Sequence, residues 1–311
     1  MKNVDVVYVL GTGSGWKNNE LRFSLRSIEK NGINAGKIFV VGEQPEFLTN
    51  VIHIPASDVF NPNVNADGNI IVKVLAACAD KRLSEDFLFI NDDHLILKPI
   101  DLNNVPAFHK GDMNGYDEIY WQPLNYWRSC RLKRTMDILN ERGLTAFHFD
   151  CHTPILFNKD LFPEVISRFN YSEGSGLTMK SLYGNSVYSK SRKRLKGEKK
   201  KVFMEYSLNE LEKRLEDCGF MSFNDDGLNK ALKIWLYRKF PERSHFELTN
   251  IEDRTIEMYR WLDKGRDYDE GVRIFEKYLH GANLIRMFRS GNNEILRKKL
   301  EFKLTNAISE L

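Results

Sequence analysis

Short apolar runs and amphipathic segments alternate along the first third of the chain. Four of the runs are rich in β-branched residues, which predicts buried strands, and two intervening segments carry apolar residues at helical spacing. A strand–helix–strand order implies parallel neighbours joined by crossover helices. The pattern therefore predicts an α/β fold of the Rossmann-like kind, with a mixed, mostly parallel sheet flanked by helices. The strands are expected at 5–10, 37–41, 51–55 and 86–90, and the helices at 20–30 and 69–82.

Beyond Pro99 the pattern becomes less regular. Residues 56–68 are rich in Asn, Asp and Pro and predict a long loop. The segment 250–311 is helical in pattern and highly charged, so we expect a main domain over 1–249 and a helical C-terminal appendage over 250–311. Further helices are expected at 131–142, 160–168 and 227–240, and short apolar runs lie at 155–157 and 220–223.

Composition and charge limit the classes of protein that the chain can be. With 42% hydrophobic and 29% charged residues over 311 positions, it should fold as a soluble globule, and a net charge of +3 does not by itself indicate nucleic acid. No apolar stretch approaches the roughly 20 residues of a membrane span, and no secretory signal is evident, so we expect a cytoplasmic protein. The four cysteines form no C-x-x-C pair, which suggests neither a zinc site nor a disulfide framework. The oligomeric state is not indicated.

The triplet Asn91-Asp92-Asp93 follows directly on the strand expected at 86–90. Open α/β sheets place their ligands at such strand ends, and two adjacent carboxylates repel one another unless a cation neutralises them. The triplet therefore predicts a site for Mg²⁺ or Mn²⁺. The alternative is a solvated turn, because Asn and Asp are common turn residues. A second triplet, Asn224-Asp225-Asp226, also follows a short apolar run.

The first expected strand opens into the glycine-rich loop Gly11-Thr12-Gly13. Backbone amides in such a loop can bind a phosphate, but Trp16 stands where the dinucleotide fingerprint requires its third glycine. Arg22 and Arg26 lie one helical turn apart in the helix that follows, and are candidates for contacts with an anionic ligand or for a structural ion pair.

A basic segment and an aromatic segment are candidates for binding surfaces. Residues 189–201 contain eight Lys or Arg and predict a polar loop, either solvated or in contact with a polyanion. The region after Pro99 carries several aromatic residues that could form the wall of a binding pocket, or simply belong to the core. They are Tyr116, Tyr120, Trp121, Tyr126 and Trp127.

Several of these motifs together resemble the Stealth family of capsular-polysaccharide sugar-phosphate transferases, which are related to GlcNAc-1-phosphotransferase. Four segments resemble the first two family blocks in order and spacing, and two short ones resemble the third and fourth. One departure is that Val9–Ser14 replaces the family's Thr-Trp-Val-Asp-Gly, so transfer at the anomeric carbon, as in an ordinary glycosyltransferase, is an alternative to sugar-phosphate transfer. The matching segments are 5–8, 20–29, 37–41 and 87–93, then 152–154 with Phe157 and Lys159, and 223–226.

The resemblance implies a GT-A enzyme that uses a nucleotide-sugar donor, such as a UDP-sugar, and a divalent metal. Asp93, supported by Asp92, would bind the metal, whereas Asn91, the Gly11–Gly13 loop and the two arginines would contact the donor. The candidate bases for the acceptor hydroxyl are His152, Asp150, Asp225 and Asp226. The structural alternatives are a buried core histidine for His152 and a helix N-cap for Asp226.

The acceptor is expected to be a glycan of the capsular-polysaccharide type. Two alternatives remain open. The basic segment would also suit a DNA glycosyltransferase of the phage type that modifies flipped bases of duplex DNA. A non-catalytic polyanion-binding protein is the alternative from another class, although it leaves both Asn-Asp-Asp triplets without a role.

Overall fold

The computed structural model describes residues 3–117, 121 and 126–248, and the appendage expected at 250–311 lies outside them. The chain divides into two compact units, which are described separately. The first comprises the residues up to 201 together with 217–222, and the second comprises 202–216 and the residues from 223 onward. The division into a main domain and an appendage stays a prediction.

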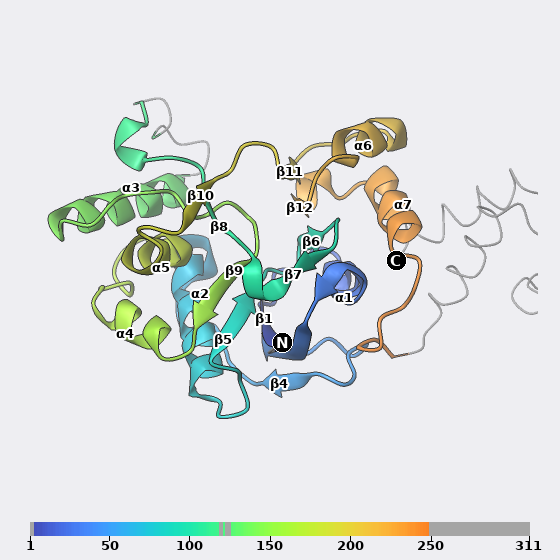
Figure 1. Ribbon diagram of the computed structural model, residues 1–311, viewed down its shortest axis with the longest axis horizontal. Coiled ribbons are helices and arrows are strands. Elements are labelled where there is room, and N and C mark those ends of the chain that lie inside the picture. The colour runs from blue at the N-terminus through green and yellow to red at the C-terminus, as the bar shows by residue number, and fades with distance from the viewer. Residues whose placement is uncertain (1–2, 118–120, 122–125, 249–311) are drawn as a thin grey trace, which may run out of the picture. The chain divides into compact units, whose positions relative to one another are not determined.

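A five-stranded sheet with the order β4-β3-β1-β5-β9 forms the centre of the first unit (Figure 1). Strand β1 pairs in parallel with both β3 and β5, β3 pairs in parallel with β4, and only the edge strand β9 is antiparallel. The prediction of a mixed, mostly parallel α/β sheet is therefore confirmed. The strands are β1 (Val4–Leu10), β3 (Ala35–Gly42), β4 (Ile52–Ile54), β5 (Asp86–Phe89) and β9 (Ile155–Asn158).

Helices cover both faces of this sheet, which explains why the central strands are apolar along their whole length. On one face, side chains of β1, β3, β5 and β9 pack against four helices in a single hydrophobic cluster. On the other face, Tyr8 meets the helix α1. The helices of the unit are α1 (Asn19–Asn31), α2 (Pro62–Ala79), α3 (Tyr126–Glu141), α4 (Leu161–Ser167) and α5 (Met179–Val187).

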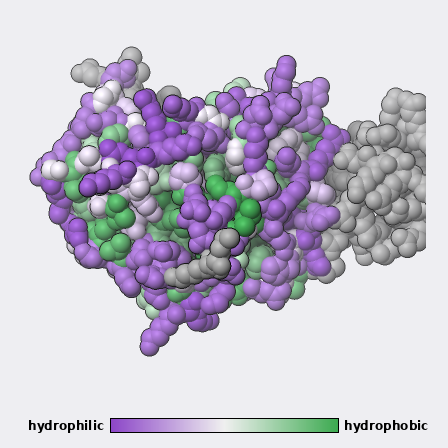
Figure 2. Space-filling view, viewed as in Figure 1, coloured by the Kyte–Doolittle hydropathy of each residue, from purple (hydrophilic) through white to green (hydrophobic). Residues whose placement is uncertain are grey.

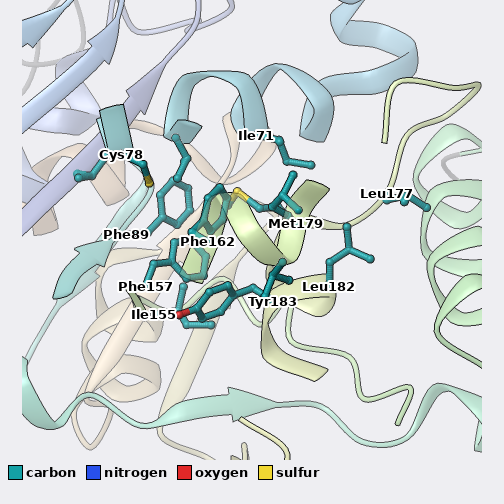
Figure 3. Packing of buried hydrophobic residues seen from close by; sticks show 14 of the residues in the cluster. Ile71, Cys78, Phe89, Ile155, Phe157, Phe162, Leu177, Met179, Leu182 and Tyr183 are labelled. Atoms are coloured by element: carbon teal, nitrogen blue, oxygen red, sulfur yellow. The ribbon is translucent and has the colours of Figure 1, made fainter. Parts of the chain in front are cut away.

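Aromatic rings form the centre of the hydrophobic cluster (Figure 3). The ring of Phe157 lies 5.7 Å from that of Phe89, 4.8 Å from Phe162 and 4.7 Å from Tyr183, which joins the sheet to α4 and α5. Edge-on and offset contacts of this kind add about 0.5–1.5 kcal/mol per pair to the burial of the rings. The surface drawn in Figure 2 is mostly hydrophilic outside this core.

Helix α2 begins earlier than its apolar pattern predicted. Asn61 caps it by accepting a hydrogen bond from the Asn63 amide, and Pro62 occupies the first turn, where its missing N–H costs nothing. The expected loop at 56–68 is therefore partly helical. The pattern concealed this first turn because a break at Asn65, with φ −128° and ψ 63°, interrupts the helical periodicity.

The polar face of α1 fixes a short strand, β6 (His94–Ile96). Ser24 Oγ donates to the carbonyl of His94 at 2.6 Å, Ser27 Oγ accepts from the Ile96 amide at 3.1 Å, and Asn31 donates to the Ile96 carbonyl at 2.7 Å. The three side chains lie on one helix face and satisfy backbone groups that a strand partner would otherwise bind. The start of β6 is thus held firmly against α1.

Short strands complete the first unit and correct the prediction for residues 189–201. The expected loop contains β10 (Arg192–Arg194), which pairs in parallel with β8 (Ala107–His109), and the first three residues of β11 (Lys199–Val202). Strand β11 belongs to the sheet β11-β12-β6, in which β12 (Phe220–Phe223) is antiparallel to β6. The density of lysine and arginine hid these strands because it masks any apolar alternation. The strands β2 (Gly32–Ile33) and β7 (Ile100–Asp101) form a further pair.

The described part of the second unit contains two helices, α6 (Leu208–Leu215) and α7 (Lys230–Lys239). Ser207 and Glu210 form a reciprocal capping box at the start of α6. Asn229 caps α7 by accepting from the Leu232 amide at 2.9 Å. The N-cap alternative considered for Asp226 is therefore wrong, because the helix begins later. No helix among the described residues is long and apolar enough to cross a bilayer.

Candidate active site

Two of the predicted motifs meet at one edge of the central sheet. Because β1 and β5 are adjacent parallel strands, their carboxyl ends lie side by side, and the Ile90 amide still donates to the Val7 carbonyl at 3.2 Å. The loop Gly11–Gly13 leaves this edge from β1, and Asn91–Asp93 leaves it from β5. This is the edge at which open parallel sheets bind ligands.

A buried ion pair supports the glycine loop. Lys73 of α2 donates to the Leu10 carbonyl at 2.8 Å and to Asp58 at 2.6 Å, and only 4% of its side chain is exposed. Gly11 lies against Asp58, since a Cβ at this glycine would stand 3.9 Å from Asp58 Oδ2. The two charges neutralise each other beneath the loop.

Asp93, His94 and His152 form a compact cluster beside these motifs. One possible metal-ligand atom from each residue lies within 4.8 Å of the others, and the two imidazole rings are 5.7 Å apart between centroids. Asp93 Oδ1 lies 3.4 Å from His94 Nε2, yet among the described residues neither atom, nor His94 Nδ1, has a hydrogen-bond partner. Buried polar atoms are rarely left in this condition, so the cluster has the character of a ligand set without its ligand.

The protonation states of the cluster suit a cation. Burial lowers the pKa of His94 well below its usual range and that of His152 to about 3, so both rings are neutral and can donate a lone pair to a metal. Burial also raises the pKa of Asp92 and of Asp93, and the neighbouring carboxylate raises that of Asp92 further. A bound divalent cation would lower the pKa of both carboxyl groups, because it favours their ionised form.

The donor set of one carboxylate and two imidazoles fits a transition metal better than Mg²⁺. Magnesium prefers an all-oxygen shell, whereas imidazole nitrogen suits the later divalent metals, and Mn²⁺ tolerates carboxylate together with imidazole. Of the two ions predicted from the sequence, the cluster therefore favours Mn²⁺.

His152 is held in a strained conformation. Its φ of 52° lies in the left-handed region, which costs a non-glycine residue of this kind of order 1–3 kcal/mol. Arg128 donates to His152 Nε2 at 3.0 Å and lies 3.4 Å from Asp150 Oδ2. Burial of Asp150 opposes its ionisation, but His152, Lys110 and Arg128 outweigh this effect and hold the pKa of Asp150 well below its usual range. Of the four predicted acceptor-side residues, His152 therefore belongs to the cluster and Asp150 lies beside it.

Four partly exposed cations act electrostatically on Asp150 or Asp93, and we call them the basic wall: Lys110, Arg128, Lys199 and Lys201. Burial together with Lys110 and Lys201 lowers the pKa of Lys199 to about 7. Sequence reasoning placed the last two lysines in a solvated loop or a DNA contact.

Two residues at the site were missed from the sequence. Lys180 of α5 is 5% exposed and donates to the Thr153 carbonyl at 2.8 Å. His94 is 1% exposed and follows directly on Asp93. Its signal was available, since a histidine next to paired aspartates is a typical metal-ligand neighbour, whereas a lone lysine in a helix carries no such signal.

The two predicted arginines are buried in α1 rather than open to solvent. Arg22 lies 3.7 Å from the centroid of the Phe47 ring and donates to Asn19, and Arg26 lies 4.9 Å from the centroid of the Phe23 ring. These contacts give both residues a structural role, and a contact with a donor stays a prediction. Asn91, in contrast, has a buried side-chain oxygen that has no partner within the described part of the chain.

Asp225 and Asp226 belong to the second unit. Both are exposed in a single 3₁₀ turn, Asp225–Gly227, and Asp226 accepts a hydrogen bond from the Asn224 side chain at 2.9 Å. Their predicted role as acceptor-side bases stays a prediction.

Of the aromatic residues after Pro99, some pack against the hydrophobic cluster and one is exposed. Tyr116 Oη lies 3.0 Å from His148 Nδ1 and its ring is 5.8 Å from that of Trp121, while both rings also pack against the hydrophobic cluster. Trp127 is 41% exposed. Tyr120 and the side chain of Tyr126 lie outside the described part of the structure.

No protein-family model matches the sequence, and no curated protein matches it either, so the resemblance to the Stealth family is not confirmed. Solved structures that match include an active-site mutant of LgtC (TM-score 0.42, 10% identity, 78% of this chain and 98% of that one). Others are the glycosyltransferase GlyE of Streptococcus pneumoniae TIGR4 (0.39, 9%, 85% and 64%) and mouse xyloside xylosyltransferase 1 (0.38, 9%, 74% and 100%). Scores and identities of this size assign no family to the chain.

Proposed function

We propose that the chain is a metal-dependent glycosyltransferase that moves a sugar from a nucleotide-sugar donor to a hydroxyl group of an acceptor. The observation that carries this proposal is the cluster of Asp93, His94 and His152 at the carboxyl edge of a parallel sheet, next to a glycine loop. A protein that binds a nucleotide diphosphate commonly neutralises its charge with a divalent cation and binds its phosphates with backbone amides of a loop. Asn91–Asp93, the end of one segment that resembles a nucleotide-sugar transferase family, lies at the same edge.

On the donor side, Asp93, His94 and His152 would hold the cation, with Asp92 in support. A cation bound there neutralises the charge that develops on the departing nucleotide diphosphate. The amides of the Gly11–Gly13 loop would bind phosphate oxygens. Such fixed donors favour the transition state because they need no rearrangement when charge develops.

On the acceptor side, Asp150 is the best-placed base among the sequence candidates. Its depressed pKa keeps it ionised at neutral pH, and Arg128 restrains its carboxylate. An ionised carboxylate can orient an acceptor hydroxyl and take its proton as the new bond forms. His152, in contrast, is suited to ligate the cation, since its neutral imidazole can donate a lone pair and it lies in the cluster with Asp93 and His94.

The experiment is an assay of nucleotide release. The full chain is incubated with a panel of nucleotide sugars and with Mn²⁺, Mg²⁺ or chelator, and free nucleotide is measured with and without sugar acceptors. We expect release that requires the metal, with Mn²⁺ supporting it at concentrations at least ~10-fold lower than Mg²⁺ because of the two imidazole ligands. Equal release in excess chelator would contradict the metal dependence. No release with any donor would contradict the assignment as a glycosyltransferase.

A further inference from the structure

Helix α5 holds the segment 147–153, which carries Asp150 and His152. This segment lies outside the helices and strands of the structure. Within the described chain, backbone hydrogen bonds to a neighbouring segment hold it only as far as His148. Beyond that point, side chains of α5 take the place of a strand partner and bind its backbone groups.

Two polar residues of α5 fix the first half of this segment. The Asn185 side chain donates to the Phe147 carbonyl and accepts from the Phe147 amide, both at 2.8 Å. Ser181 Oγ accepts from the Phe149 amide at 3.1 Å. A Cβ at Gly184 would stand 2.5 Å from the Phe149 ring, so this glycine lets the segment lie directly against the helix.

Lys180, in the first turn of α5, fixes the second half of the segment. Its ammonium donates to the Thr153 carbonyl at 2.8 Å, one residue beyond His152. The same ammonium lies 5.3 Å from the centroid of the Phe89 ring in β5, the strand that Asn91–Asp93 follows. One side chain therefore contacts both of the segments that carry the cluster. Unlike the cations of the basic wall, Lys180 is buried.

Neither its burial nor its position in the helix favours a lysine here. Burying an ammonium is costly, although Asp150 and Asp93 act favourably on this one. The first turn of a helix also disfavours positive charge, because the free amides there carry partial positive charge. The site beside Lys180 therefore explains this lysine better than the stability of the helix does.

The hydrogen bond to Thr153 matters because of the backbone of His152. The left-handed conformation of His152 persists in a residue other than glycine only where the surroundings hold it. Pro154 restricts Thr153 to extended conformations, and Lys180 fixes the carbonyl of Thr153. Together these two restrictions set the direction in which the chain leaves His152.

We infer that Lys180 is a positioning residue of the candidate cation site. Its ammonium holds the Thr153 carbonyl and thereby keeps His152 in the left-handed conformation that places the imidazole in the cluster. Metal ligands depend on such outer-shell contacts for their orientation, and losing one commonly costs about 10–100-fold in metal affinity. This inference rests on the metal site of the proposed function and adds to it a residue outside the ligand set.

The test is a calorimetric titration of Mn²⁺ into the full chain, which needs no turnover. Lys180→Met keeps most of the side chain and removes the ammonium, and should weaken Mn²⁺ binding by ~10-fold or more. A purely electrostatic role predicts the opposite sign, because loss of a positive charge near a cation site tightens binding. Tighter or unchanged binding would overturn the inference. If Lys180→Met does not fold, Lys180→Gln replaces it, with a smaller loss of the same sign expected because the amide still donates.

Lys159→Met is the matched control. The Lys159 ammonium also donates to backbone carbonyls, those of Asp80 at 2.9 Å and Leu83 at 3.3 Å, but it follows the end of β9 opposite to Thr153. This variant should change Mn²⁺ affinity less than about 2-fold, because distant sites act independently. Equal losses in the two methionine variants would indicate a general effect on the fold and would also overturn the inference.

A double-mutant cycle shows whether Lys180 acts through His152. Because His152→Ala already removes the ligand, adding Lys180→Met to it should change Mn²⁺ affinity less than about 2-fold. Electron spin echo spectra of bound Mn²⁺ detect the nitrogen of coordinated imidazole. They should indicate two histidine ligands in the wild-type chain and one in either single variant. A further ~10-fold loss in the double variant would show that Lys180 acts independently of His152, against the inference.

Failure of this inference and failure of the proposed function have different signatures. If nucleotide release requires Mn²⁺ but Lys180→Met binds Mn²⁺ as tightly as the wild-type chain, only the inference is wrong. If Mn²⁺ binds in a Lys180-dependent manner but no nucleotide sugar is cleaved, Lys180 positions the metal site of a protein with another activity. A wild-type chain that binds no Mn²⁺ would contradict both.

Discussion

The chain contains the triplet Asn-Asp-Asp twice, and the two copies have different environments. Asn91–Asp93 follows β5 in the first unit, where the Asp93 side chain is 28% exposed and its Oδ1 is buried against His94. Asn224–Asp226 follows β12, and both of its aspartates are exposed in a 3₁₀ turn. The same three residues after the same kind of apolar run thus give a candidate cation site in one case and a solvated turn in the other.

The difference comes from what the rest of the fold brings to each triplet. The next residue, His94, and His152 from a distant segment lie close to Asp93, whereas Asp226 of the second triplet accepts a hydrogen bond from its own neighbour, Asn224. A carboxylate that completes its hydrogen bonds locally is stabilised little by a cation. A carboxylate whose buried oxygen has no partner is stabilised more strongly when it binds a cation.

The largest expected effect tests this comparison directly. Asp93→Asn should weaken Mn²⁺ binding by roughly 10²-fold or more, because loss of an outer-shell partner alone costs a metal site about 10–100-fold. Asp226→Asn, the same change in the other triplet, should alter Mn²⁺ affinity less than about 2-fold because an exposed carboxylate with a local partner adds little. Calorimetric titration of Mn²⁺ into each variant measures both. Equal losses would contradict the assignment of the cation site to Asn91–Asp93.

A second prediction concerns how α1 holds the first triplet. Ser24→Ala would remove the hydrogen bonds that Ser24 makes with the His94 carbonyl and the Tyr8 hydroxyl, and should lower the free energy of unfolding by about 2 kcal/mol and weaken Mn²⁺ binding. Ser207→Ala removes the α6 capping box in the other unit and should cost about 1 kcal/mol without changing Mn²⁺ affinity. Chemical denaturation gives the stabilities. Unchanged Mn²⁺ affinity in Ser24→Ala would show that His94 does not depend on α1.

A third prediction follows from the unpartnered nitrogens of His94. Replacing this buried ring by Leu should raise the free energy of unfolding of the metal-free chain by about 1 kcal/mol, because two desolvated polar atoms are removed, and should abolish Mn²⁺ binding. His53→Leu is the control, since His53 Nε2 is hydrogen-bonded to the Gly42 carbonyl at 2.8 Å and its loss should destabilise. Destabilisation of both variants to the same extent would contradict the assignment of His94 as a ligand.

The smallest expected effect concerns Arg128, which competes with a cation for His152. Arg128→Gln should tighten Mn²⁺ binding by a few-fold, because it removes a positive charge and the hydrogen bond to the imidazole. Lys133→Gln, a change one turn further along α3 at a lysine paired with Asp137, serves as the control and should leave Mn²⁺ affinity unchanged. Weaker binding in Arg128→Gln would show that this arginine supports the histidine rather than competing with the metal.

Local pattern predicted the elements that deliver the first triplet. The apolar runs of β1 and β5 are legible because strands buried on both faces must be apolar throughout, and the polar triplet then marks the strand end. Patterns failed where polar residues dominate an element. The capped first turn of α2 and the lysine-rich strands β10 and β11 belong to this class.

By itself, the sequence determined the order of strands and helices, the mostly parallel sheet and the placement of Gly11–Gly13 and Asn91–Asp93 at strand ends. Only the tertiary structure decided that His152 joins His94 beside Asp93, and that the lysines of β11 act electrostatically on Asp93. The physical reason is that periodicity encodes which face of an element is buried, a local property. The convergence of side chains from distant segments depends on strand order and on backbone that other elements fix, as α1 fixes β6. The pattern of a single segment therefore cannot predict it.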